Sequence, residues 1–131
     1  MVTEAGIAYL QKELPDCMFL YLGETDEVGH GTGWMGKEYL DCIKGAWDCI
    51  EKIYRSLPDG YTLITTADHG GHGRSHGSTD PQDMTIPICF CGKRFKPDTE
   101  IENLSIKDIT PTIARLLDVP FAPEWEGTPR C

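Results

Sequence analysis

The segment from Tyr61 to Gly77, YTLITTADHGGHGRSHG, decides the fold prediction because it joins an apolar run directly to a polar, glycine-rich loop. The part up to Ala67 is rich in β-branched residues, which is typical of a buried strand. Asp68 and three histidines follow this strand without a break, and the glycines among them allow the backbone to bend sharply. Side chains that carry chemistry just beyond the end of a strand are typical of sites in α/β proteins.

The segments on either side of this stretch complete an α/β pattern. Apolar runs of strand length cover 17–23 and 85–92. Apolar residues at helical spacing cover three further segments: 3–14, 36–57 and 105–119. Because the chain of 131 residues has the size of one domain, we expect a single α/β domain over residues 1–131. The alternation predicts a layered fold with a mainly parallel central sheet flanked by helices.

The last helical segment carries its own start signals. Ser105 is a favoured N-cap residue, and Asp108 stands at the capping-box position three residues later. Pro111 fits a helix only near its first turn. We therefore expect the regular helix to begin around Thr110.

The composition excludes several classes of protein. Aspartate and glutamate total 21 and lysine and arginine total 12, so the formal net charge of −9 disfavours binding to a nucleic-acid backbone. No apolar run reaches the ~20 residues of a transmembrane helix, and the N-terminus lacks a basic region followed by an apolar one. We therefore expect a cytoplasmic protein without membrane contact, in which the six cysteines are reduced and mostly buried.

A first cluster of polar side chains lies in TDEVGHG, directly after the run 17–23. Asp26 and His30 are four residues apart, and Gly29 permits a tight turn between them. A carboxylate and a neutral imidazole at this spacing can converge on one cation. The alternative is that Asp26 only caps the helical turn that carries His30.

A second cluster follows the strand 61–67. Asp68 and His69 can both reach a metal ion only where the backbone bends sharply, and His76 follows in the same polar loop. Any one of these histidines taken alone could be a solvated loop residue. All four histidines of the chain nevertheless fall in the two clusters, at the ends of consecutive predicted strands, which favours a metal site.

Three separated motifs together carry a family resemblance: TDEVGHGTG, TTADHGGHGRSHG and DMTIPICFCG. They resemble the metal-binding half of the alkaline phosphatase superfamily, in its type I phosphodiesterase and nucleotide pyrophosphatase branch. The resemblance covers nearly the whole chain and implies an alkaline phosphatase-like fold with two divalent metal ions. It implies that Asp26, His30 and His76 hold the first ion, and that Asp68 and His69 hold the second.

Two residues near these motifs have no ligand role under this resemblance. His72 could donate a hydrogen bond to a metal ligand, contact the substrate or be solvated, and we favour one of the last two interpretations. Arg74 could meet an anionic ester, although an arginine in a polar loop is usually solvated.

The sequence departs from the family pattern at its start. Members of the family begin with a strand that ends in an aspartate ligand, followed by a threonine or serine nucleophile at a helix N-terminus. We find neither in this chain, so the second metal site is expected to be incomplete and no catalytic nucleophile is assigned. The chain is therefore expected to be the C-terminal part of a hydrolase, truncated, split or a remnant, and weakly active or inactive alone.

The functional prediction is a metal-dependent hydrolase of small phosphoric esters, of the phosphodiesterase or nucleotide pyrophosphatase type. The alternatives are a sulfatase or phosphosugar mutase of the same superfamily, or a catalytically silent metal-binding or interaction module. Nitrogen and carboxylate ligands suit zinc best, with manganese or iron as alternatives. The missing strands would leave an exposed sheet edge, to which an N-terminal half or a second copy of the chain could bind.

Overall fold

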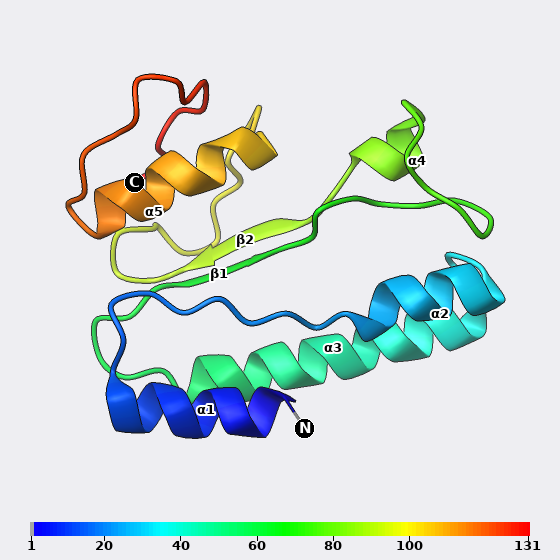
Figure 1. Cartoon of the computed structure of the whole chain (residues 1–131), viewed down its shortest axis with the longest axis horizontal. Helices are drawn as coiled ribbons and strands as arrows, with labels where there is room; N and C mark the ends of the chain where they lie inside the picture. The colour runs from blue at the N-terminus through cyan, green and yellow to red at the C-terminus, as the bar shows by residue number, and fades with distance from the viewer. Residues whose placement is uncertain (1) are drawn as a thin grey trace.

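The computed structural model describes residues 2–131 (Figure 1). In chain order the elements are α1 (Val2–Glu13), α2 (Glu24–Thr32), α3 (Lys37–Arg55), β1 (Leu63–Thr66), α4 (Pro81–Met84), β2 (Ile88–Cys91), η1 (Ile106–Asp108) and α5 (Ile109–Leu116). Figure 1 shows α1, α2 and α3 on one side of the strand pair β1–β2 and α5 on the opposite side. The helices α1–α3 and α5 thus lie on opposite sides of the strand pair, in a small α/β arrangement.

The helices follow the local signals of the sequence. α3 is the longest and packs against α2 and α1 with Ile53 buried, while Leu40, Trp47 and Tyr54 of its apolar stripe are exposed. α1 ends where Leu14 takes a φ of 47° and Pro15 follows, which cannot continue the helix. At the other end of the chain the capping box at Ser105 is present, and Pro111 lies in the first turn of α5. These helix predictions are confirmed.

The sheet differs from the prediction, because it has two strands and they are antiparallel. Leu63 pairs with Cys91 and Thr66 pairs with Ile88, so the chain reverses through residues 67–87 instead of crossing over the sheet. The run 17–23 is no strand, since no backbone hydrogen bond of the described residues joins 17–21 to a neighbour. A mainly parallel sheet is therefore not shown. Apolar periodicity identifies an extended segment, but it does not determine which partner, if any, completes its hydrogen bonds.

The interior of the described residues is small. The buried apolar side chains are Leu10, Ile53 and Ala114, while Phe19 is 89% exposed and Tyr21 is 63% exposed. Buried polar residues account for much of the rest: Thr3, Asp83, Asp108 and Thr112. A large part of the apolar surface thus faces outward.

The exposure of the cysteines and the apolar length of the helices were both predicted from the sequence. All six cysteines are free thiols, but Cys17, Cys89 and Cys91 are exposed and the other three are only partly buried, so the expectation that they are mostly buried is wrong. The alternation of side chains along β2 turns Cys89 and Cys91 outward. Within residues 2–131 no helix has the length and apolar character needed to cross a membrane.

Candidate metal centre

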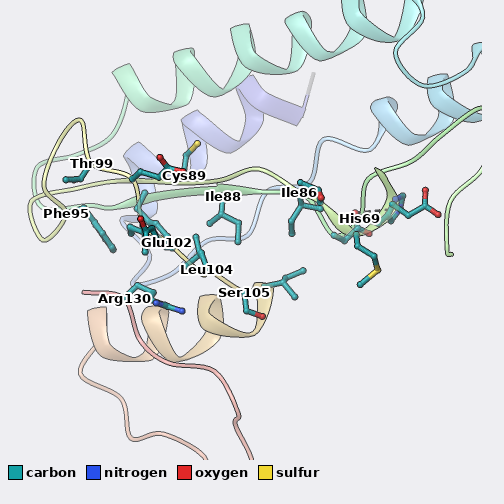
Figure 2. Close-up of a pocket in the computed structure, with 18 of the residues that line it drawn as sticks. His69, Ile86, Ile88, Cys89, Phe95, Thr99, Glu102, Leu104, Ser105 and Arg130 are labelled. Atoms are coloured by element: carbon teal, nitrogen blue, oxygen red, sulfur yellow. Dashed lines mark ion pairs between the residues drawn. The ribbon is translucent and has the colours of Figure 1, made fainter. Parts of the chain in front are cut away.

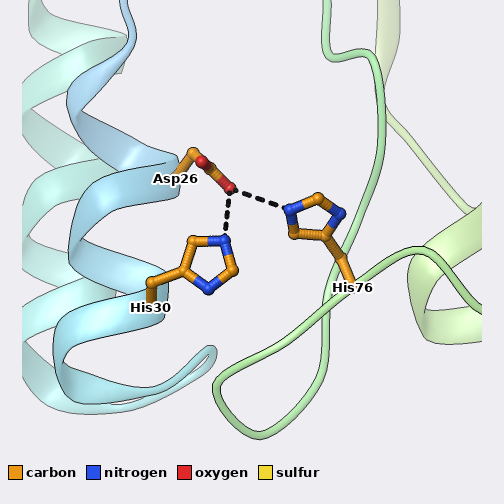
Figure 3. A group of neighbouring side chains, drawn as sticks. All are labelled: Asp26, His30 and His76. Carbon is orange, nitrogen blue, oxygen red and sulfur yellow. Dashed lines mark ion pairs between the residues drawn. The ribbon is translucent and has the colours of Figure 1, made fainter.

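Asp26 and His30 lie one turn apart on α2, so both side chains project from the same face of the helix (Figure 3). His30 Nε2 is 3.6 Å from Asp26 Oδ1. The sequence alternative, in which Asp26 caps the turn before His30, is not observed, because Gly23 occupies the N-cap position. The carboxylate is free to face the histidines.

His76 approaches the same carboxylate from the loop between β1 and α4 (Figure 3). Its Nε2 is 3.5 Å from Asp26 Oδ1. One ligand atom from each of Asp26, His30 and His76 lies within 4.8 Å of the other two. The fold therefore brings together three of the residues that the sequence singled out, from two segments far apart in the chain.

The chemistry of these groups fits a divalent cation. Asp26 Oδ1 is buried and has no hydrogen-bond partner among the described residues, which is costly for a carboxylate oxygen. His30 Nδ1 donates to the Arg74 carbonyl oxygen at 3.0 Å, and this bond leaves the Nε2 lone pair facing Asp26. A carboxylate oxygen and unprotonated imidazole nitrogens are ligands that zinc and manganese accept.

His69 lies against this group, and Asp68 lies on its exposed side, next to His69. His69 Nε2 is 3.8 Å from Asp26 Oδ1 and also 3.8 Å from Asp68 Oδ1. Its Nδ1 donates to the Gly70 carbonyl oxygen at 2.7 Å, and its ring stacks on that of His76 with centroids 3.7 Å apart. The Asp68 side chain is 78% exposed. The two predicted ligand sets are thus neighbours, and Asp68 is the most exposed of their five residues.

Trp34 forms a wall of the centre that sequence reasoning missed. Its indole packs edge-on against His30 with centroids 5.1 Å apart, and also contacts His76. A Cβ atom at Gly29 would lie 2.7 Å from the indole, and one at Gly71 would overlap it. Both glycines are therefore required by the position of this ring. The available signal was a large aromatic residue just after a motif rich in glycine.

His72 and Arg74 both lie near the cluster without being part of it. His72 Nδ1 donates to Asp83 Oδ1 at 2.7 Å, so this imidazole is neither simply solvated nor part of the cluster. The hydrogen bond raises the pKa of His72 and, with those from Ser78, lowers the pKa of Asp83 to about 2. The exposed Arg74 contributes its carbonyl oxygen to His30. Asp83 and Ser78 were not identified from the sequence.

A groove of about 1450 Å³ adjoins the centre at Asp68 and His69 (Figure 2). It continues along β2 and the loop 92–105 to the start of η1, with His69 near one end and Arg130 near the other. Apolar side chains supply much of its wall: Ile86, Ile88, Phe90, Phe95 and Leu104. A molecule in this groove would meet the histidines only at its end.

Comparison with known proteins identifies a family and several relatives. Residues 1–120 match the Metalloenzyme superfamily. The chain is 30% identical over 122 residues to a phosphopentomutase of Alkaliphilus oremlandii, covering 92% of this chain and 31% of that protein. It is 30% identical over 140 residues to a 2,3-bisphosphoglycerate-independent phosphoglycerate mutase of Acaryochloris marina, covering 97% of this chain and 26% of that protein. No solved structure matches.

These relatives confirm the superfamily and correct the branch. The chain spans between 26% and 31% of the length of the two relatives, and both carry the names of mutases. The prediction of a phosphodiesterase or nucleotide pyrophosphatase type of hydrolase is therefore wrong, and the alternative of a phosphosugar mutase is favoured. The metal motifs alone could not make this distinction, because the branches share them. The chain belongs to the Metalloenzyme superfamily, whose fold is alkaline phosphatase-like.

Proposed function

We propose that this chain is the metal-binding part of an enzyme of the phosphosugar mutase type, in which Asp26, His30 and His76 hold one divalent cation. The observation that carries the proposal is the buried Asp26 Oδ1, which has no hydrogen-bond partner and is faced by imidazole nitrogens at 3.5 and 3.6 Å. The mutase names of the relatives support the reaction class. Zinc is the preferred ion, with manganese or iron as alternatives.

A second ion is proposed at Asp68 and His69, with these two residues as an incomplete ligand set. His69 supports this because its Nδ1 is held by a carbonyl oxygen, so that in the neutral imidazole the lone pair lies on Nε2. The proximity of His69 to Asp26 makes the two sites adjacent. Asp68 supports it less strongly, since its exposed carboxylate must turn toward the ion.

The proposed substrate is a small phosphorylated sugar. The net charge of −9 opposes the approach of such an anion. A divalent ion at the centre supplies the local positive charge that attracts phosphoryl oxygens, and acts on them as a Lewis acid. The chain's own residues orient the imidazoles through carbonyl oxygens and shield one side with Trp34. We further propose that the exposed Arg74 contacts the phosphate group.

The exposed apolar surface is proposed to bind a further part of the same fold. Phe19 and Tyr21 point outward from an extended segment whose backbone is unpaired over 17–21, so a strand can add there. The greater length of the relatives favours an N-terminal half over a second copy of this chain as the partner. Sedimentation of the chain with and without such a segment tests this, since a self-associating surface would give a dimer without it.

The function is tested by titrating the metal-free protein with zinc and manganese in a calorimeter, followed by a mutase assay on a phosphorylated pentose. We expect tight binding that is lost in His30→Ala, whereas Glu27→Gln, an exposed carboxylate on the same helix, binds normally. Activity is expected when the partner segment is supplied. Failure of the wild-type protein to bind either metal at millimolar concentration would contradict the proposal.

A further inference from the structure

Asp83, on the short helix α4, is a buried carboxylate that does not belong to the candidate metal group. Its side chain is only 2% exposed, and its carboxylate is satisfied by one segment of the chain, residues 67–80, named here the histidine loop. Oδ1 accepts from His72 Nδ1 at 2.7 Å. Oδ2 accepts from Ser78 N at 2.9 Å and from Ser78 Oγ at 2.7 Å.

The partners of Asp83 lie on both sides of His76 in the histidine loop. His72 precedes His76 by four residues and Ser78 follows it by two, so one carboxylate joins the two arms of the loop. Between the arms His72 and Ser75 exchange two backbone hydrogen bonds of 3.0 Å, which close the turn. The segment that carries His76 is thus fixed at its beginning and its end.

The backbone of α4 holds the start of the histidine loop as well. Gly70 N donates to the Asp83 carbonyl oxygen at 2.7 Å. A Cβ atom at Gly70 would overlap the Gln82 carbonyl oxygen and lie 2.9 Å from that of Thr85. Only glycine therefore permits this close approach, directly after His69.

His76 depends on this support more than the other histidines of the centre. His30 and His69 each donate Nδ1 to a backbone carbonyl oxygen, and these bonds orient their rings. Within residues 2–131 the His76 side chain has no such partner, and its ring is held by stacking on His69 and by contact with Trp34. The position of His76 Nε2 is consequently determined by the backbone of the histidine loop.

We propose that Asp83 is a positioning residue that, through His72 and Ser78, holds the histidine loop closed so that His76 reaches Asp26. This inference rests on the proposed function, because it gives His76 the role of a metal ligand. The pKa directions agree with it: the hydrogen bond to Asp83 raises the pKa of His72, and that of Asp83 lies at about 2. Supporting groups of this kind typically change metal affinity about 10–100-fold when they are removed.

The test compares Asp83→Asn with Asp108→Asn, a second buried carboxylate remote from the centre. Zinc affinity is measured by calorimetry, and the four imidazoles are followed by 15N NMR in the metal-free protein. We expect zinc affinity to fall about 10–100-fold in Asp83→Asn, with changed His76 and His72 resonances and an unchanged His30 signal. Asp108→Asn is expected to lower the unfolding temperature and to leave zinc affinity unchanged.

Ser78→Ala provides a milder variant in case Asp83→Asn does not fold. It removes the 2.7 Å bond from Ser78 Oγ but keeps the bond from the backbone nitrogen, so a loss of severalfold in zinc affinity is expected. Wild-type zinc affinity in Asp83→Asn, or in Ser78→Ala where the first variant is unfolded, overturns the positioning role. Absence of zinc binding by the wild-type protein overturns the proposed function instead.

Discussion

Two aspartates of this molecule, Asp108 and Asp26, each bury a carboxylate oxygen, and their surroundings are opposite. Asp108 Oδ1 accepts from Thr128 N at 2.7 Å. Its Oδ2 accepts from Ser105 N at 2.9 Å and from Arg130 at 2.9 Å (Nε) and 2.6 Å (Nη2). Asp26 Oδ1 has no hydrogen-bond partner among the described residues, although three imidazole Nε2 atoms face it at 3.5 to 3.8 Å.

The difference separates a structural carboxylate from one suited to a ligand. Asp108 joins the start of α5 to the C-terminal tail, and the neighbouring Arg130 guanidinium neutralises its charge. A buried carboxylate with all partners present stabilises the fold, whereas one without partners costs free energy unless something else binds it. In Asp26 the missing partner is proposed to be a cation, so the two aspartates should respond to the same substitution in opposite ways.

The largest effect is expected for Asp26→Asn. Loss of the anionic oxygen should lower zinc affinity by more than 100-fold, because that atom lies between the histidines. The metal-free variant should be at least as stable as the wild type, because the buried Oδ1 of Asp26 has no hydrogen-bond partner that the substitution could remove. Calorimetric titration and denaturant unfolding measure the two quantities. A strongly destabilised metal-free protein would mean that Asp26 is a structural residue like Asp108.

The next largest effect is expected for Asp108→Asn, on stability alone. The amide has only one accepting oxygen, so it cannot accept from Thr128 and also from Ser105 and Arg130, which bond the two different oxygens of Asp108. The guanidinium also loses its counter-charge, so the free energy of unfolding should fall by about 2 kcal/mol. Denaturant unfolding with and without zinc checks this. Loss of metal binding in this variant would contradict the assignment of a purely structural role to Asp108.

A smaller effect is expected for Gly29→Ala, which tests the wall beside Asp26. The new methyl group would displace the Trp34 indole, since its position lies 2.7 Å from the ring, at a cost of about 1–2 kcal/mol. Zinc affinity and Trp34 fluorescence should change together. Gly31→Ala on the same helix has open space at its Cβ and should be neutral or stabilising. Equal zinc affinities in the two variants would show that Trp34 does not shape the metal centre.

The smallest effect is expected from pH on the Asp83–His72 pair in the metal-free protein. The folded pKa of Asp83 is lowered to about 2, so its contribution is present above the unfolded value of 3.8 and is lost as pH falls toward 2. The folded pKa of His72 is raised, so its contribution is present below 6.5 and is lost as pH rises through the raised value. Unfolding temperatures from pH 2 to 9 should show both losses. In His72→Asn the unfolding temperature should no longer fall at high pH through this pair. If the same fall is still seen in the variant, His72 is not its cause.

Sequence reasoning succeeded where the signal is local. The capping box at Ser105 depends only on neighbouring residues, and the structure shows it. Asp26 and His30 were expected at a tight turn and instead lie on the helix α2, whose geometry brings residues four apart to one face. The convergence of His76 on Asp26 was implied by the family resemblance rather than by spacing. The donor atoms of these residues indeed lie together.

The remaining features depend on contacts that no local pattern encodes. The role of Asp83 requires the histidine loop to fold back onto α4, and that of Trp34 requires two glycines from separate segments to meet one ring. The strand predicted at 17–23 has the right apolar pattern, but pairing depends on a neighbouring strand that the sequence of the segment does not specify. The reaction class was missed for a similar reason, because metal ligands do not distinguish a hydrolase from a mutase.

The most direct test of the account is a zinc titration of the metal-free protein, followed through the 15N signals of its four histidines. We predict that the Nε2 signals of His30 and His76 shift first and together. Nδ1 of His30 should keep its proton and continue to donate it to the Arg74 carbonyl oxygen. His72 should stay paired with Asp83 and remain unchanged. Zinc that shifts His72 alone, or no histidine at all, would contradict the assignment of Asp26, His30 and His76 as the metal centre.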